Sequence, residues 1–446
     1  MKTNFKQLAA LALALTVTFA SCSKDNGDDN NIDGKGTANV QLVVNTGASS
    51  ATRAATGNEG AVVGTEDKLA SAIDVFVFNA SSGLLEYAGS QAITGTTTDN
   101  SFQVTTGDKY FYVFSDPNSS SLLGLAAHYG TTLHFSVFET LLHNETKTAI
   151  ETAEGVNMAN TTTGAFINAT LWREKKTISA SGTVSVNVGR TVGKIRVNPL
   201  TTIATNMAGA FSAPQVRLGS TPIKSYFVGQ YAGSVVPPGT GTGHGAVTSA
   251  VHTEPWEDPM VSGAQNPVFA NYATWTAIGT NAALYYGNEN TTKADGTGKL
   301  YYGNTTYVEV ETIYTPDPSE VKSAADYTVA GGALSGGTFY TATVNGVKYI
   351  FDATPTDARI DVGSVVVYTN GKNYHKFPVR DRGEVGLENQ CRVLRNHIYD
   401  ITINRIDQLG EGTPGVDPST PIVEEVDVKV TINVLQWSKV TQGENL

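Results

Sequence analysis

The sequence predicts a mostly β protein, built as two mostly antiparallel β-sandwiches in tandem with few short helices. Several segments alternate apolar and polar residues with a period of two, which is typical of strands with one buried face. Glycine, threonine, serine, asparagine and valine are abundant, and the chain has 45 glycines, 19 tyrosines and 16 phenylalanines. Such a composition favours strands and turns over helical bundles.

The bulk properties exclude some classes of protein. The chain has 446 residues, which is enough for about two or three domains. Its formal net charge is −11, so it lacks the basic surface that nucleic-acid binding requires. Only two cysteines occur, so the fold must be stabilised by core burial rather than by a disulfide framework.

Residues 1–21 have the features of a secretory signal. A positively charged start, Met1–Lys6, precedes an apolar segment, Leu8–Ala20, that is too short to cross a bilayer. Cys22 follows small residues, as in a bacterial lipoprotein signal, and we expect it to be lipidated. The alternative is an ordinary signal peptide with a chance cysteine. With Cys22 lipidated, Cys391 has no partner in its own chain and is expected to be a free, buried thiol.

The first predicted strand is Ala38–Val44. Its apolar side chains share one face and are Ala38, Val40, Leu42 and Val44. Small residues and Arg53 follow, in a segment that we expect to be an exposed loop open to proteases. From the residues alone, a solvated loop arginine is the better interpretation of Arg53.

The first sandwich is expected to end near residue 199. Its predicted strands are Leu69–Phe78, Tyr110–Phe114, Thr183–Val188 and Lys194–Val197, the last of which closes the unit. A helix is predicted after Ser136 because Ser136–Glu139 has the form of a capping box and apolar residues follow on one side. Pro199 and the polar residues after it indicate a domain boundary, so the second sandwich spans residues 200–446.

The second sandwich is predicted from a further series of short strands, with an irregular insertion from about residue 233 to residue 275. The predicted strands are Gln215–Leu218, Tyr226–Val228, Tyr307–Ile313, Thr338–Val344, Lys348–Phe351, Val365–Tyr368 and His397–Ile403.

The last predicted strand follows a segment rich in proline and glycine, residues 408–424, which is interpreted as an extended tether. In Val426–Val434 every second residue is β-branched and apolar, namely Val426, Val428, Val430, Ile432 and Val434. By pattern alone this is an ordinary last strand of its own domain. Whether it lies free or folds back in the monomer is left open.

No pattern of residues indicates an enzyme, a cofactor or a metal site. The zinc-protease, serine-hydrolase, redox and phosphate-binding motifs are missing from the sequence. The segment from Asp29 to Gly34 begins like a calcium loop, but Val40 stands where the bidentate glutamate is required. Trp256 and Trp275 are candidates for a sugar-binding platform, although aromatic residues in sandwiches more often pack in the core.

The chain resembles the Bacteroidales fimbrillins over nearly its whole length. The likeness is carried by Cys22, by the small-residue loop with Arg53, by Thr183–Val197, by Asn304–Glu311 and above all by the tail. The tail consists of Arg395–Ile403, the tether, and Val426–Trp437. Within the family, the main subunit of the short (minor) fimbriae is most similar, and the long-fimbria fimbrillins are a little further off.

The resemblance implies a type V pilin with two transthyretin-like domains. It implies lipidation of Cys22, cleavage between Arg53 and Ala54 by an arginine-specific protease, and loss of the propeptide, residues 22–53. A donor strand, residues 425–437 with Trp437 near its end, would then fill the vacated groove of another copy. Further implied partners are anchor and tip subunits of the fimbria, and the outer membrane through the lipid of the precursor.

The residues themselves give this implication a physical reason. Ala38–Val44 and Val426–Val434 have the same alternating pattern, so they are able to compete for one groove. Loss of the first would expose apolar surface and unpaired strand edges that seek a partner. The alternative function is a surface glycan-binding lipoprotein that uses Trp256 and Trp275.

Overall fold

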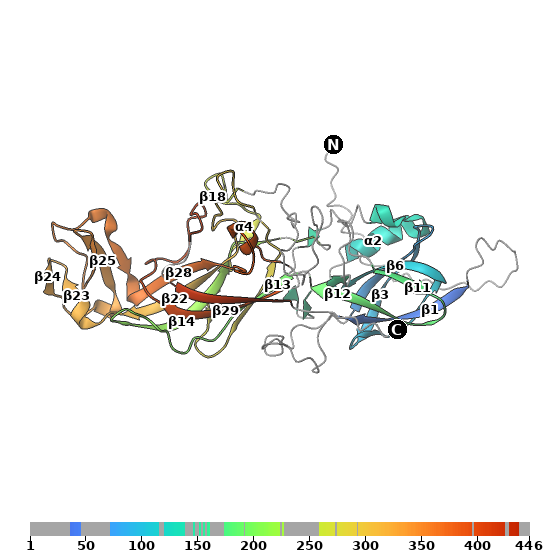
Figure 1. Ribbon diagram of the computed structural model, residues 1–446, viewed down its shortest axis with the longest axis horizontal. Coiled ribbons are helices and arrows are strands. Elements are labelled where there is room, and N and C mark those ends of the chain that lie inside the picture. Colours follow the sequence, from blue (N-terminus) through green and yellow to red (C-terminus); the bar gives the residue numbers. More distant parts are fainter. Residues whose placement is uncertain are drawn as a thin grey trace. The chain divides into compact units, whose positions relative to one another are not determined.

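The computed structural model describes most of the chain between residues 36 and 436. The described residues are 36–45, 72–115, 120–138, 146–147, 151–152, 155–156, 158–160, 174–190, 192–223, 225–226, 258–272, 274–291, 293–394, 397–423 and 428–436. They form many strands and few helices, so the prediction of a mostly β fold is confirmed (Figure 1). None of the helices in these ranges is long and apolar enough to span a membrane.

The first group of strands forms one large sheet. Its members are β1 (Thr37–Asn45), β2 (Ala72–Asn79), β3 (Leu85–Thr94), β4 (Thr97–Thr98), β5 (Phe102–Thr105), β6 (Gly107–Ser115), β10 (Met158–Asn160), β11 (Glu174–Ile178) and β12 (Gly182–Arg190). Their order is β10-β12-β1-β4-β3-β2-β6-β11, and β5 pairs with β1. Since β10 also pairs with β6, the path closes on itself.

Both faces of this sheet are covered. Ile73, Val75 and Val77 of β2 lie in an inner cluster, while Phe76 and Phe78 lie in an outer one. The outer cluster includes residues of helix α2 (Ser120–Tyr129) and of the helical residues 135–138. This explains why β2 is apolar at consecutive positions, because a strand that is covered on both sides has no polar face.

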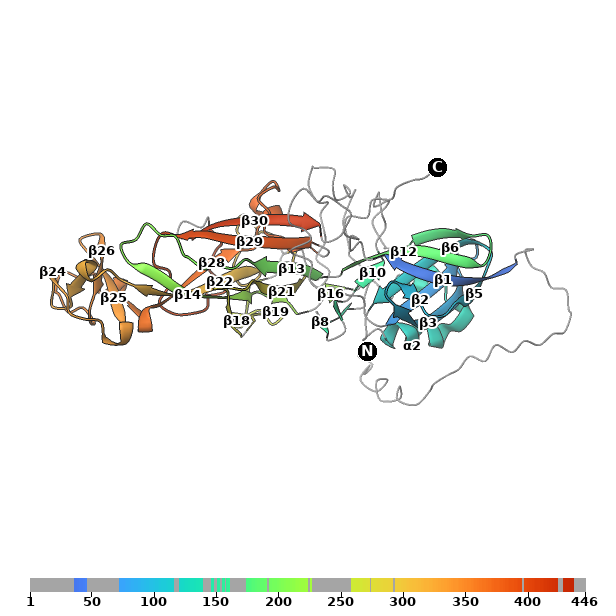
Figure 2. The same ribbon diagram turned by 90° about the horizontal axis from the view of Figure 1, so that it is seen from below.

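Two four-stranded sheets organise the later part of the chain. One has the order β21-β13-β29-β30 and the other β20-β14-β22-β28. Their strands are β13 (Val192–Val197), β14 (Ala210–Gly219), β20 (Thr276–Ala277), β21 (Ala283–Asn288), β22 (Tyr307–Thr315), β28 (Lys372–Pro378), β29 (His397–Ile406) and β30 (Val428–Gln436). Figure 2 shows β29 and β30 side by side.

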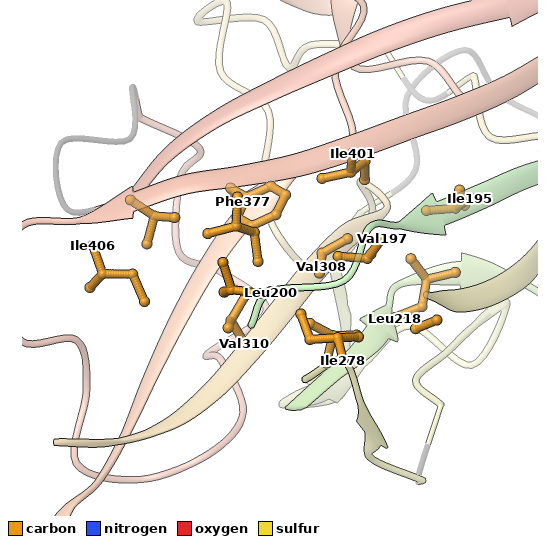
Figure 3. Close-up of a cluster of buried hydrophobic side chains, with 14 of the residues drawn as sticks. Ile195, Val197, Leu200, Leu218, Ile278, Val308, Val310, Phe377, Ile401 and Ile406 are labelled. Atoms are coloured by element: carbon orange, nitrogen blue, oxygen red, sulfur yellow. The ribbon is translucent and has the colours of Figure 1, made fainter. Parts of the chain in front are cut away.

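These two sheets enclose one apolar core. Ile195 and Ile401 come from one sheet, and Val308, Val310 and Phe377 come from the other (Figure 3). All five side chains are fully buried. Two sheets that face each other across such a core form a β-sandwich, as the alternation in the sequence predicts.

Smaller elements complete the fold. A five-stranded sheet has the order β24-β23-β26-β25-β27 and contains β23 (Val321–Ser323), β24 (Asp326–Ala330), β25 (Phe339–Val344), β26 (Val347–Phe351) and β27 (Val366–Tyr368). The short strands are β7 (Thr146–Lys147), β8 (Glu151–Thr152), β9 (Gly155–Val156), β15 (Thr221–Pro222), β16 (Ser225–Tyr226), β17 (Met260–Val261), β18 (Ala264–Gln265) and β19 (Phe269–Ala270). The other helical turns are η2 (Gly130–Thr132), η3 (Pro318–Glu320), η4 (Ser335–Gly337), η5 (Val362–Ser364), η6 (Thr369–Gly371) and α4 (Leu387–Gln390).

One predicted strand belongs to a different sheet from the one expected. We expected Lys194–Val197 to close the first group, but β13 pairs with β21 and, in parallel, with β29. Its residues therefore contribute to the sandwich core of the later strands. The division of the chain at residues 54–199 and 200–446 stays a prediction.

Candidate functional site

The strand β1 lies inside its sheet, with partners on both edges. One edge pairs in parallel with β12, from Val40 opposite Gly182 to Asn45 opposite Asn187. The other edge pairs with β5 over Thr37–Val40 and with β4 at Val43. Removal of β1 would therefore leave two facing strand edges and a gap one strand wide.

The inward side chains of β1 are the most deeply buried of the candidate residues. Ala38 is 1% exposed, and Val40, Leu42 and Val44 are 0% exposed. All four belong to the inner cluster, together with Val75, Val113, Val186 and others. The sequence correctly identified these four as one apolar face, and their loss would open a deep apolar groove.

Polar contacts fix the register of β1. The backbone N–H of Leu42 donates to Thr98 Oγ1 at 3.0 Å, and Gln41 Nε2 donates to the Thr98 carbonyl at 2.7 Å. The N–H of Asn39 donates to Ser181 Oγ at 2.9 Å. These donors belong to β1, so the acceptors on Thr98 and Ser181 would be free for another strand if β1 left.

The last strand, β30, pairs with its own chain. It runs antiparallel to β29, with Val428 opposite Ile406, Ile432 opposite Ile401, and a bulge between Ile403 and Arg405. Within the described residues, β30 is the outermost strand of its sheet. The question left open by the sequence is thereby answered, since the described part of the tail is folded back.

The alternation predicted for β30 is present but its burial is incomplete. Val428 is 2% exposed, Val430 and Ile432 are only partly buried against the sandwich core, and Lys429, Thr431 and Asn433 are exposed. Asn404 Nδ2 donates to Thr431 Oγ1 at 2.9 Å on the outer face. In its own chain, β30 therefore buries less of its apolar face than β1 does.

The segment before β30 is attached to the fold rather than free. We call residues 410–422 the belt. The backbone of Glu411 exchanges two hydrogen bonds with Tyr374, at 2.7 and 2.8 Å. Further along, the Pro418, Thr420 and Ile422 backbones bond to residues 300–303. Ile422 is 6% exposed, so the extended segment expected as a tether is pinned along most of its length.

Side chains reinforce the belt. Tyr368 donates its hydroxyl proton to the Gly410 carbonyl at 2.8 Å, and the Gly415 N–H donates to Glu309 Oε1 at 2.5 Å. Lys376 forms an ion pair with Glu411. Burial, and then the hydrogen bond with Glu311, raise the pKa of Tyr374 to about 12, so this hydroxyl stays protonated at neutral pH.

Two glycines allow the belt to lie this close. A Cβ atom on Gly410 would lie 2.1 Å from the Tyr374 carbonyl oxygen, and one on Gly412 would lie 2.1 Å from that of Val367. The sequence showed these glycines only as signs of an extended segment. Their actual role is to permit contact between two backbones.

Several predicted site residues lie outside the described residues. These are Cys22, Arg53, Ala54, Trp256, Val426 and Trp437. Of Val434 only the backbone is described, and it pairs with Tyr399. Lipidation, cleavage and the full length of the donor strand therefore stay predictions.

Trp275 takes part in packing. Its ring faces the Arg217 guanidinium at 4.5 Å and lies 5.9 Å from the Tyr374 ring. Arg217 also forms an ion pair with Glu309 at 2.6 Å, and Glu309 accepts the belt hydrogen bond. One face of Trp275 is thus occupied by a cation, and the residue supports the surface under the belt.

The described residues contain no group of three or more histidine, cysteine, aspartate or glutamate side chains that could hold a metal ion. Cys391 is buried, as predicted. The candidate site is therefore a strand position, β1, together with a strand that has the same pattern, β30.

Residues 366–443 match the family model described as major fimbrial subunit protein type IV, fimbrillin, C-terminal. This stretch of the chain is therefore similar to the carboxyl-terminal region of fimbrillins. The matched region includes β28, β29, the belt and β30. A search of curated proteins finds no match.

Solved structures of low identity are similar over most of the chain. A fimbrilin of Porphyromonas gingivalis is 15% identical, covers 91% of this chain and 99% of its own, and has a TM-score of 0.46. A cell adhesion protein of Parabacteroides distasonis is 14% identical over 90% and 100%, with a TM-score of 0.46. The truncated tip fimbrial protein Mfa3 of P. gingivalis is 11% identical over 90% and 100%, with a TM-score of 0.39. At these values the likeness carries no argument about function.

Proposed function

We propose that this chain is a stalk subunit of a cell-surface fimbria that polymerises by donor-strand exchange. An arginine-specific protease cuts between Arg53 and Ala54 and releases the segment that contains β1. The β30 strand of another copy then occupies the vacated position. The fimbria supports adhesion and biofilm formation, and anchor and tip subunits complete it. Before cleavage the precursor is an outer-membrane lipoprotein held by the lipid on Cys22.

The observation that carries this proposal is the position of β1. It is an interior strand by pairing, yet it lies at the start of the chain, upstream of Arg53. A strand so placed leaves its sheet after one cut in the chain. It leaves behind a groove with two strand edges, which is the type of surface that binds a further strand by β-augmentation.

The energetic preference follows from burial. In its own chain, β30 leaves Val430 and Ile432 partly exposed, whereas the corresponding inward positions of β1 are 0–1% exposed. Full burial of these two side chains would add roughly 1 kcal/mol each. Pairing on both edges, instead of one, adds backbone hydrogen bonds along the whole strand.

The belt defines which part of the chain moves. Among the described residues its last backbone hydrogen bond is that of Ile422, so β30 is able to leave without breaking the belt's hydrogen bonds. The strands β30 and β1 have nine residues each. At about 3.3 Å per residue each spans roughly 30 Å, so β30 has the length of the position that β1 leaves. Each subunit gives one strand and accepts one, so the assembly is an open filament and not a closed ring.

Electron microscopy of the full chain before and after arginine-specific proteolysis tests this function. Mass spectrometry first establishes that the cut lies after Arg53. We expect filaments only after the cut. The matched control is Arg53→Lys, which keeps the positive charge but removes the cleavage site, and it should stay monomeric in the same protease. Filaments from uncut chains would refute the trigger, and cut chains that stay monomeric would refute the exchange.

The second candidate function, glycan binding, has one supporting observation, which is that Trp275 is only partly buried. Because Arg217 covers one ring face, a sugar would have to use the other. Binding of sugars by the uncut monomer, lost in Trp275→Ala, would favour this function.

A further inference from the structure

The strand β5 forms one wall of the proposed groove, and its pairing depends on β1. Thr37–Val40 of β1 lie opposite Phe102–Thr105 of β5. In the described part of the chain, β1 is the one strand that pairs with β5. Once β1 leaves, backbone pairing no longer holds β5 in place. A loose β5 would collapse into the gap or unfold, and the groove would lose that edge.

Side chains of β3 hold the far end of β5. The Thr105 N–H donates to Glu86 Oε2 at 2.9 Å, and the Thr105 hydroxyl donates to Glu86 Oε1 at 2.6 Å. Lys109 of β6 donates to Glu86 Oε1 at 3.0 Å and to Thr105 Oγ1 at 2.7 Å, and Asn79 of β2 donates to Glu86 Oε1 at 2.8 Å. We call Asn79, Glu86, Thr105 and Lys109 the Glu86 clamp.

The clamp is a buried ionic unit. The Lys109 side chain is 0% exposed and that of Glu86 is 14% exposed. Burial acts to raise the pKa of Glu86, but the hydrogen bonds from Thr105, Asn79 and Lys109 outweigh it and lower this pKa. The carboxylate is therefore charged at neutral pH. Since Asn79, Glu86 and Lys109 belong to β2, β3 and β6, the clamp does not depend on β1.

An aromatic stack holds the near end of β5. The Phe102 and Tyr87 rings are stacked, with centroids 4.1 Å apart and planes inclined by 16°. Glu86 lies between Leu85 and Tyr87 at a bulge of β3, where the register with β2 shifts. One residue pair thus holds each end of β5.

We infer that the Glu86 clamp and the Tyr87–Phe102 stack keep β5 in position after β1 has left, so that the incoming strand meets a preformed groove wall. These are positioning residues for strand exchange and do not themselves pair with the donor. The inference rests on the proposed function, since it concerns the state after cleavage. A preformed wall speeds association because the ordering cost is already met in the folded subunit.

Thr105→Val is the variant that tests the clamp. It keeps a β-branched residue of similar size and leaves the Lys109–Glu86 ion pair in place, but it removes the hydroxyl between them. Thr177→Val is the matched control. Thr177 of β11 also donates its hydroxyl to a carboxylate, Asp108 Oδ1 at 2.6 Å, but β11 pairs with β6 and not with β1. Tyr87→Leu tests the stack in the same way.

Two measurements are made on the full chain after the cut at Arg53 and removal of residues 1–53. Hydrogen exchange at low protein concentration reports on residues 102–105, and light scattering reports on the rate of filament growth. We expect Thr105 to stay protected in the parent chain and to exchange about tenfold faster in Thr105→Val. Filament growth should slow by a similar factor in Thr105→Val and in Tyr87→Leu, and Thr177→Val should match the parent.

Full exchange of residues 102–105 in the parent chain after loss of β1 would overturn the inference. So would growth of Thr105→Val at the parent rate. Circular dichroism of the uncut variants establishes that they fold. If the parent chain itself forms no filaments, the proposed function fails. Hydrogen exchange at residues 102–105 still decides whether β5 keeps its position without β1.

Discussion

His375 is a buried titratable residue beneath the belt. It belongs to β28, is 4% exposed, and lies next to Gly410, where an added Cβ atom would be 2.9 Å from His375 Nδ1. Within the described structure, its Nε2 atom has no hydrogen-bond partner. Burial lowers the pKa of His375 from 6.5 to about 4. The imidazole is therefore neutral in the fold at physiological pH.

This shift predicts a pH dependence of stability. Between pH 6.5 and about 4 the unfolded chain binds a proton at His375 and the folded chain does not. The unfolding free energy therefore falls as the pH drops through this range, by about 3 kcal/mol, and is unchanged by this group above it. Urea unfolding at several pH values measures the slope, and His375→Phe should show a smaller one. Equal slopes for the two proteins would contradict the prediction.

Gly412 provides a test of the belt at a single position. A Cβ atom there would lie 2.1 Å from the Val367 carbonyl oxygen. We expect Gly412→Ala to shift the belt locally and to lower the unfolding free energy by about 1–3 kcal/mol. The control is Gly296→Ala, where no atom lies within 4 Å of the added Cβ. Urea unfolding compares the two, and equal midpoints would mean that the belt is not tightly held.

At the scale of single residues, periodicity in the sequence identified the buried face of a strand. It did not identify residues whose role depends on contacts between distant parts of the chain. The inward set of β1, from Ala38 to Val44, was predicted because alternation alone separates the two faces of a strand. Glu86 and Lys109 gave no signal, because they meet only when β3 and β6 are brought together. The hydrogen bond from Gly415 to Glu309 joins residues 106 positions apart, which no local pattern reveals.

At the scale of elements, the strands were predictable and their partners were not. The segments interpreted as strands around residues 75, 112, 310 and 400 correspond to β2, β6, β22 and β29. Lys194–Val197 was predicted as a strand but assigned to the preceding unit, because Pro199 and the polar residues after it indicated a domain boundary. Helix α2 was missed, since Gly124 and two serines at its start make its local helical preference weak.

Removal of β30 tests its role as an element. A chain that lacks residues 426–446 loses an edge strand, so the sandwich core should stay folded. We expect the unfolding free energy to fall by about 3–5 kcal/mol, chiefly from exposure of the core under Val428 and its neighbours. Circular dichroism and urea unfolding measure this effect. After cleavage at Arg53 this chain should give monomers by size-exclusion chromatography, and filaments would show that β30 is not the donor.

At the scale of the whole molecule, the proposed strand exchange requires two separate events. The groove is open only after β1 leaves, and β30 is available only after it leaves β29. In the proposed filament, each copy carries both the groove and the donor strand and uses them with different neighbours. Because β1 is covalently part of the precursor, its effective concentration at the groove greatly exceeds that of any second chain. The uncut protein is therefore expected to stay monomeric even at high concentration.

The last prediction places the groove and the donor strand in two different chains. A cut chain without residues 426–446 has an open groove and no donor. The uncut Arg53→Lys chain has a donor and a closed groove. Mixed together, they should form a one-to-one dimer. The dimer should grow no further, because the cut chain has no donor strand and the uncut chain has no open groove.

Multi-angle light scattering measures the mass of the mixture, and each chain alone provides the control. The dimer should form as β30 of the uncut chain leaves β29, so its rate of formation should not exceed the rate at which β30 opens, which the β29 amides report when opening limits their exchange. Filaments in the mixture would mean that contacts other than the exchanged strand propagate the assembly. Two monomers that never associate would mean that an uncut chain cannot release β30, and that cleavage at Arg53 controls the donor as well as the groove.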